Sequence, residues 1–125
     1  MHDNALGNYK ELIVWQRAMQ LCRATYEATE ACPESERFGL VSQMRRAAVS
    51  IPSNIAEGQG RLGRNEFRQF LGIARGSLRE LETQLLLGRD LGTMDDGAVS
   101  KCLALADEVG RMLTTLIGTL HTRNA

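Results

Sequence analysis

The stretch EGQGRLGRNEF, residues 57–67, comes closest in this chain to a motif that does chemistry. Its glycines Gly58, Gly60 and Gly63 spell G-x-G-x-x-G, the pattern of a loop that cradles the pyrophosphate of a dinucleotide. Such a loop must follow a β-strand and open a helix within a βαβ unit. Here the preceding segment has helical periodicity. The glycines therefore predict a hairpin between two helices and argue against a nucleotide fold.

Arginines are dense around this loop. Residues 37–79 hold eight arginines against two glutamates, a balance of +6, whereas residues 1–36 and 80–125 each carry −3. The basic segment either contacts phosphates or pairs with the acidic segments, within the fold or between subunits. Free N–H groups at the start of the next helix could also hold an anion, with a solvated turn as the alternative. The candidate nucleic-acid or anion-binding residues are Arg61, Arg64, Arg68 and Arg75.

A row of polar residues follows one side of the helix before the loop. Arg46, Ser50 and Asn54 step by four residues and Glu57 by three, beside the apolar stripe of the same helix. The row is either a buried or subunit-facing network that fixes register or a binding surface for RNA, DNA or protein. No Ser–His–Asp arrangement, Cys–His pair or paired-carboxylate site is legible in it, so no enzyme is predicted.

The helix after the loop carries the matching partners. If the two helices pair about the loop centre, Arg45 and Arg46 lie near residues 77–81. This register predicts an ion pair between one of these arginines and either Glu80 or Glu82.

Cysteine and histidine usage argues against metals and cofactors. Cys22, Cys32 and Cys102 are an odd number without C-x-x-C spacing, which favours reduced thiols in the cytoplasm. The two histidines, His2 and His121, lie near opposite ends of the chain and do not show the spacing of a zinc site. We also expect no signal peptide and no membrane span.

Four helical segments must position these residues. Apolar residues recur at alternating steps of three and four, which places them on one stripe of each helix. On the first helix the predicted core stripe is Leu12, Trp15, Met19, Cys22, Tyr26 and Thr29. On the second it is Val41, Met44, Ala48, Ile51 and Ile55, and on the third it is Phe67, Phe70 or Leu71, Ala74, Leu78, Leu81 and Leu85. On the fourth it is Val99, Cys102, Ala106, Val109, Leu113, Leu116 and Leu120. The predicted helices cover about residues 9–31, 34–57, 65–91 and 95–121.

Local signals set the predicted boundaries. Asn8 can cap the first helix, and Pro33 ends it. Pro52 predicts a kink in the second helix, because its ring displaces a carbonyl one turn back, and Gly58 fits the left-handed position after that helix. Gly92 stops the third helix, and a Thr93/Asp96 pattern caps the fourth.

The repeat near 3.5 residues and the short connections together predict the fold. We expect a single all-α domain over residues 1–125, an antiparallel up-down-up-down four-helix bundle with left-handed supercoiling. At 125 residues with 43% hydrophobic content, the chain is large enough for one core.

Two long stretches carry a family resemblance. RRAAVSIPSNIAEGQGR, residues 45–61, and EFRQFLGIARGSLRELETQL, residues 66–85, resemble the bacterial four helix bundle family named for proteins encoded in intervening sequences of 23S ribosomal RNA genes. The resemblance spans about residues 9–120. The residues that match its signature are Arg45, Arg46, Ser50, Asn54, Glu57, Gly58, Ser77, Glu80 and Glu82.

The resemblance implies a four-helix bundle that assembles into a homopentameric ring and has no enzyme activity. The family includes the accessory variability protein of diversity-generating retroelements, which is strongly basic, binds nucleic acid and works with a reverse transcriptase. The present chain departs from that member in its net charge of zero. Two functions follow as expectations: a nucleic-acid-binding accessory protein, or a protein scaffold without nucleic-acid affinity.

Overall fold

The computed structural model describes residues 7–122, and those residues form helices and turns with no strand. A single 3-10 turn, Tyr9–Glu11, precedes helix α2, Ile13–Glu30. A second 3-10 turn, Glu34–Glu36, precedes α3, Leu40–Gln59, which is followed by α4, Arg64–Asp90, and α5, Asp96–Thr122.

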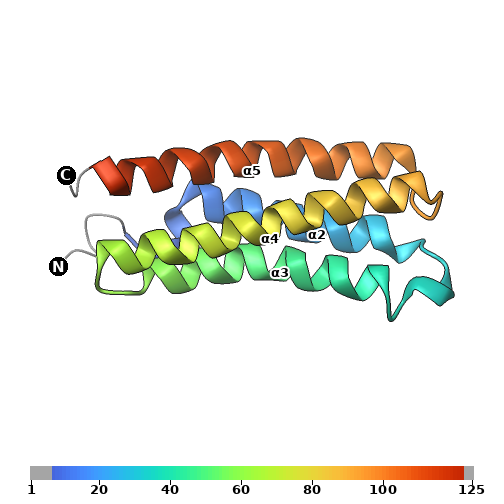
Figure 1. Ribbon diagram of the computed structural model, residues 1–125, viewed down its shortest axis with the longest axis horizontal. Coiled ribbons are helices and arrows are strands. Elements are labelled where there is room, and N and C mark those ends of the chain that lie inside the picture. Colours follow the sequence, from blue (N-terminus) through green and yellow to red (C-terminus); the bar gives the residue numbers. More distant parts are fainter. Residues whose placement is uncertain (1–6, 123–125) are drawn as a thin grey trace.

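The four long helices make the predicted all-α bundle. Each runs antiparallel to the next, and both ends of the described chain lie at the same end of the bundle (Figure 1). The four helices form a closed bundle, because α2 packs on α3 and α5, and α4 packs on the same two helices. Pro52 lies inside α3, which is one continuous helix as expected. The kink at Pro52 and the handedness of the supercoil stay predictions.

The first two helices begin later than the sequence suggested. The Asn8 side chain caps the N-terminal 3-10 turn by accepting a 2.8 Å hydrogen bond from the Lys10 N–H, but the α-helix starts only at Ile13 because Leu12 is extended. The second helix was predicted from residue 34. It begins at Leu40, because Gly39, with φ −110° and ψ −107°, separates it from the short 3-10 turn.

Two capping predictions were wrong. Gly58 does not follow α3 but lies buried within it, where a Cβ would sit 2.6 Å from Phe70 Cβ. The glycine therefore permits close helix packing. Thr93 does not cap α5, since its hydroxyl donates to the Gly88 carbonyl at 3.1 Å. Asp95 caps that helix by accepting from the Ala98 N–H at 3.0 Å. Gly92 ends α4 with φ +75°, as predicted.

The core confirms three of the four predicted stripes. The predicted residues of α3 are all buried, α4 buries Leu71 rather than Phe70, and on α5 only Leu116 stays half-buried. On α2 the stripe was misplaced by about one residue. That helix buries Val14, Ala18, Leu21, Thr25 and Thr29, while Tyr26 is 40% exposed. Two of the residues that α2 buries, Ala18 and Ala24, are small.

Candidate functional site

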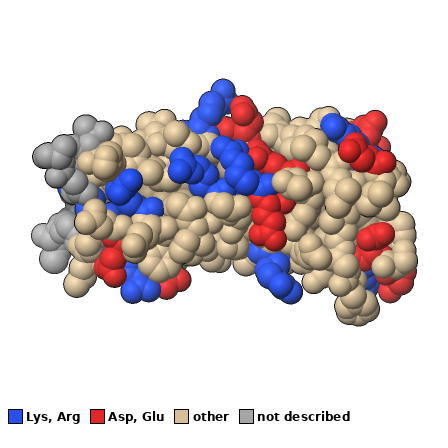
Figure 2. All heavy atoms as spheres, in the orientation of Figure 1, with Lys and Arg blue, Asp and Glu red and all other residues tan. Residues whose placement is uncertain are grey.

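Four arginines form a straight row on one side of α4. Arg64, Arg68, Arg75 and Arg79 step by four, seven and four residues, which places them within roughly 60° of one another around the helix. The row faces α5, because the Arg75 guanidinium donates to the Thr114 hydroxyl at 3.3 Å. We call these four residues the arginine stripe. Figure 2 shows Lys and Arg atoms gathered along the border between α4 and α5, with acidic atoms beside them.

Most of the stripe has no balancing carboxylate. Arg79 pairs with Glu82 at 2.9 Å. Among residues 7–122, Arg64, Arg68 and Arg75 make no ion pair, and the buried Nε of Arg68 has no hydrogen-bond partner. The α4 helix also begins beside the stripe, with Gly63 as its N-cap and no side chain capping it. The arrangement therefore presents uncompensated positive charge that suits an anionic ligand.

Arg61, the remaining candidate, lies apart from the stripe. Its guanidinium pairs with Glu57 at 2.8 Å and lies 4.8 Å above the centre of the Phe70 ring. Phe70 is on the side of α4 that packs against Gly58 of α3, whereas the stripe faces α5. The charge of Arg61 is therefore balanced by Glu57 near the end of α3, so Arg61 is a poorer anion ligand than the other three candidates.

The serine and asparagine of the predicted polar row form a half-buried network between α3 and α4. The Ser50 and Ser77 hydroxyl oxygens lie 2.8 Å apart. The Asn54 amide donates to the Ser50 carbonyl at 2.8 Å and to its hydroxyl at 2.9 Å. With so many partners inside the fold, these three residues link two helices rather than present free groups to a ligand.

The predicted ion pair of Arg45 or Arg46 with Glu80 or Glu82 was wrong. Arg45 faces α2, where its Nε donates to the Thr29 hydroxyl at 2.9 Å and its guanidinium lies 4.5 Å above the Tyr26 ring. It also pairs with Glu30 at 3.4 Å. The predicted register was about one turn off, since Ser50 meets Ser77, and Arg45 lies on the side of α3 that faces α2.

The other three members of that prediction are also placed differently. Glu82 pairs with Arg79 on its own helix. Glu80 accepts a hydrogen bond from Gln84 at 3.3 Å. Arg46 is exposed and makes no hydrogen bond or ion pair with any residue that the structure describes.

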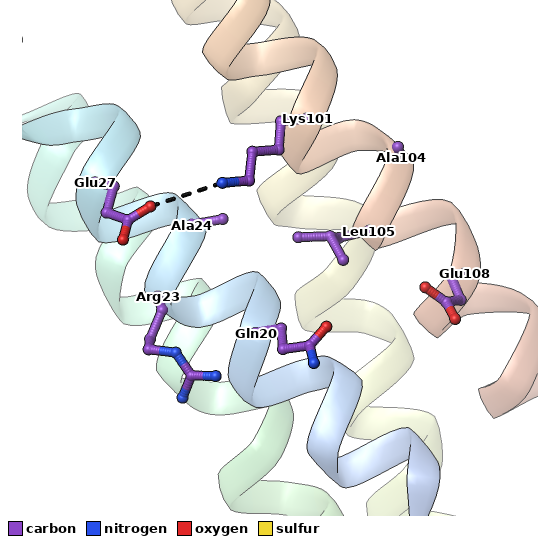
Figure 3. Close-up of a pocket in the computed structure, with 8 residues that line it drawn as sticks. All are labelled: Gln20, Arg23, Ala24, Glu27, Lys101, Ala104, Leu105 and Glu108. Atoms are coloured by element: carbon purple, nitrogen blue, oxygen red, sulfur yellow. Dashed lines mark ion pairs between the residues drawn. The ribbon is translucent and has the colours of Figure 1, made fainter.

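A shallow hollow of about 470 Å³ lies between α2 and α5 (Figure 3). Ala24, Ala104 and Leu105 line its apolar part, and Glu27 reaches across to Lys101 at 3.9 Å. Glu108, which also lines it, accepts from Arg17 at 2.9 Å. The carboxylates of the hollow are thus held by cations and are not arranged as an acid and base pair.

No metal or thiol chemistry stands out in the part of the chain that the structure covers. No group of three or more His, Cys, Asp or Glu residues in that part is placed to hold a metal ion. Burial raises the pKa of the Cys22, Cys32 and Cys102 thiols, which makes them poor nucleophiles at neutral pH. His2 lies outside the described residues.

Two features escaped the sequence reasoning. Arg79 extends the stripe, and its spacing of four residues from Arg75 was a visible signal. The grooves between helices could not be predicted from the sequence, because their positions depend on how each helix is rotated about its own axis. None of the helices within residues 7–122 is long and apolar enough to cross a membrane.

Comparisons with known proteins agree with the fold. A crystal structure of a protein of unknown function from the S23 ribosomal protein family of Bacteroides thetaiotaomicron VPI-5482 matches with a TM-score of 0.77 and 21% identity, covering 85% of this chain and 96% of that one. Comparison with curated protein sequences gives no match. The model of the 23S rRNA-intervening sequence protein family matches residues 10–115. The chain therefore belongs to the 23S rRNA-intervening sequence protein family.

Proposed function

We propose that this chain is a non-enzymatic, cytoplasmic accessory protein that binds nucleic acid through its phosphates and acts as a homo-oligomer, with the pentamer as the expected state. The observation that carries the proposal is the arginine stripe, in which Arg64, Arg68 and Arg75 have no carboxylate partner among the described residues. Their spacing of four and seven residues corresponds to about 6 and 10 Å along the helix. Such a row can neutralise several phosphates of one backbone.

The family description adds a reason to test RNA first, since it names an intervening sequence of 23S rRNA. The net charge of zero does not oppose this proposal, because binding depends on local charge. Most acidic residues of the chain lie outside residues 37–79, and of those closest to the stripe in sequence only Glu82 pairs with it, through Arg79.

The second candidate is a scaffold without nucleic-acid affinity. It is favoured by the pairing of four of the eight arginines in residues 37–79 with glutamates of the same chain. These are Arg37, Arg45, Arg61 and Arg79. In this alternative the stripe would meet acidic residues of another protein.

Fluorescence anisotropy of labelled RNA and DNA across a salt series separates the two. We expect the logarithm of the association constant to fall linearly with the logarithm of the salt concentration, with a slope of about −0.7 to −0.9 per phosphate contacted. The variant Arg64→Ala/Arg68→Ala/Arg75→Ala should lose most of the affinity and most of the slope.

The matched control removes the same charge elsewhere, with Arg23→Ala/Arg37→Ala/Arg89→Ala, which changes three exposed arginines outside the stripe. Equal losses in both triple variants would overturn the assignment of the site. Absence of binding at about 50 mM salt would overturn the nucleic-acid function and leave the scaffold.

A further inference from the structure

A second row of residues on α4 is exposed and has no cover within the chain. Ile73, Gly76, Glu80, Thr83 and Leu87 step by three and four residues, the spacing of a helix-packing seam. Ile73 is 51% and Leu87 46% exposed, and a Cβ at Gly76 would meet no atom within 4 Å. We call this row the α4 ridge. It lies roughly 120° around the helix from the arginine stripe.

Glu80 stands at the centre of the ridge, seven residues from Ile73 and from Leu87. Its carboxylate accepts one hydrogen bond, from Gln84 at 3.3 Å, and pairs with no cation of the described chain. An apolar residue therefore lies about 10 Å to each side of one unbalanced carboxylate.

A groove on a different side of the molecule carries an unpaired positive charge instead of a carboxylate. It lies between α2 and α3, has a volume of about 770 Å³, and is lined by Tyr26, Phe38, Val49 and Arg46 among others. Phe38 is 92% exposed, an unusual state for a phenylalanine, and Val49 is 42% exposed. We call it the α2–α3 groove.

Arg46 is the unbalanced charge of this groove. Arg37 and Arg45 also line it, but each is paired with a glutamate of the same wall. Arg46 makes no ion pair with the described residues and lies eight residues after Phe38 and three before Val49. Here, too, a single free charge lies between exposed apolar side chains.

We propose that the α4 ridge of one copy of this chain packs into the α2–α3 groove of the next copy, with Glu80 facing Arg46. One unpaired carboxylate then meets one unpaired guanidinium, and the apolar residues on either side cover one another. Exposed apolar residues accompany the charge on both surfaces, since Ile73 and Leu87 lie on either side of Glu80 and the groove of Arg46 is lined by Phe38 and Val49. The proposal rests on the homo-oligomer of the proposed function and names its contact.

The contact joins two different surfaces, so it is heterologous. Such contacts propagate from copy to copy and close into a ring when the rotation allows it. Because the ridge and the arginine stripe lie on different sides of α4, the same helix can serve the contact and still present Arg64, Arg68 and Arg75.

The test is the molar mass of the purified full chain, measured by light scattering and by sedimentation across a concentration series. We expect the wild type at a multiple of 13.8 kDa. Arg46→Glu and Glu80→Arg should each weaken the association about tenfold or more, since each sets like charges opposite one another. The double variant Arg46→Glu/Glu80→Arg should restore it. Arg23→Glu, an exposed arginine outside both surfaces, is the control and should leave the mass unchanged.

The outcomes separate this contact from the oligomer itself. A wild type that stays oligomeric, with Arg46→Glu and Glu80→Arg at the same mass, overturns the contact and leaves the oligomer of the proposed function. A monomeric wild type at all concentrations overturns both. Circular dichroism shows whether each variant is folded, and restoration by the double variant excludes misfolding as the cause of dissociation.

Discussion

The hydroxyl oxygens of Ser50 on α3 and Ser77 on α4 lie 2.8 Å apart, which makes a direct hydrogen bond between the two helices. Asn54 fixes this contact from one turn further along α3, because its amide donates to both the carbonyl and the hydroxyl of Ser50. A half-buried polar link of this kind favours one register of two helices over a slip by one turn.

Removal of either serine should therefore destabilise the fold. Ser77→Ala leaves the Ser50 hydroxyl with Asn54 and should cost about 0.5–1.5 kcal/mol in the free energy of unfolding, whereas Ser50→Ala takes a partner from both neighbours and should cost more. Urea unfolding of the single and double variants gives the coupling energy. Strictly additive losses would contradict a direct bond.

The close approach of α3 to α4 at Gly58 makes a second prediction. A Cβ there would lie 2.6 Å from Phe70 Cβ and 3.1 Å from the Phe67 ring, so Gly58→Ala forces the helices apart and should cost about 1–3 kcal/mol. Gly72→Ala is the matched control. No atom lies within 4 Å of its Cβ position, and alanine there should stabilise α4 by about 0.5–1 kcal/mol. The same sign for both changes in urea unfolding would refute the packing argument.

Much of this fold could be predicted from the sequence, because the apolar spacing of α3, α4 and α5 is nearly unbroken. The stripe of α2 was misplaced because Ala18 and Ala24 contribute little apolar area, although both are buried. Trp15 and Tyr26 are larger, so the predicted stripe was placed on their side of the helix. Periodicity locates a helix face only to within the width of one residue when alanines form its centre.

The candidate site was less predictable, because charge pairing depends on which side of a helix each residue occupies. Arg45 and Arg46 are adjacent in sequence, yet one stacks on Tyr26 and the other stays exposed. Arg61 and Arg64 are three residues apart, yet only Arg61 meets a carboxylate. Sequence spacing could identify the arginines of the stripe but not which of them keep an unbalanced charge.

Arg45 should contribute to stability through its geometry rather than its charge. Its guanidinium donates to the Thr29 hydroxyl and to the Tyr26 carbonyl while lying over the Tyr26 ring. Arg45→Ala should lower the free energy of unfolding by about 1–3 kcal/mol. Arg45→Lys should recover only part of this loss, because a single ammonium group cannot make both guanidinium hydrogen bonds and stack on the ring.

The control for this prediction removes only the charge partner. Glu30 is largely exposed, so Glu30→Gln should change the free energy of unfolding by less than about 0.5 kcal/mol. A full recovery in Arg45→Lys, together with a large loss in Glu30→Gln, would show that charge pairing dominates.

The three thiols should make stability fall at alkaline pH. Burial raises the pKa of Cys22, Cys32 and Cys102 in the folded chain, whereas the unfolded chain has ordinary thiols with a pKa of about 8.5. Below that pH both states keep their protons and the thiols have no pH-dependent effect. As pH rises above it, the unfolded state releases protons first, so the stability contribution is lost progressively through the folded pKa values.

Urea unfolding of the wild type and of Cys22→Ala/Cys32→Ala/Cys102→Ala at about pH 7.5 and pH 9.5 measures this effect. The wild type should lose more stability between the two pH values than the triple variant, in which the tyrosines and lysines still titrate. In the native chain, Cys102, which is fully buried, should react with a thiol reagent much more slowly than the half-buried Cys22 and Cys32. Equal rates for all three thiols, or equal pH dependence in both proteins, would mean that burial does not suppress thiolate formation here.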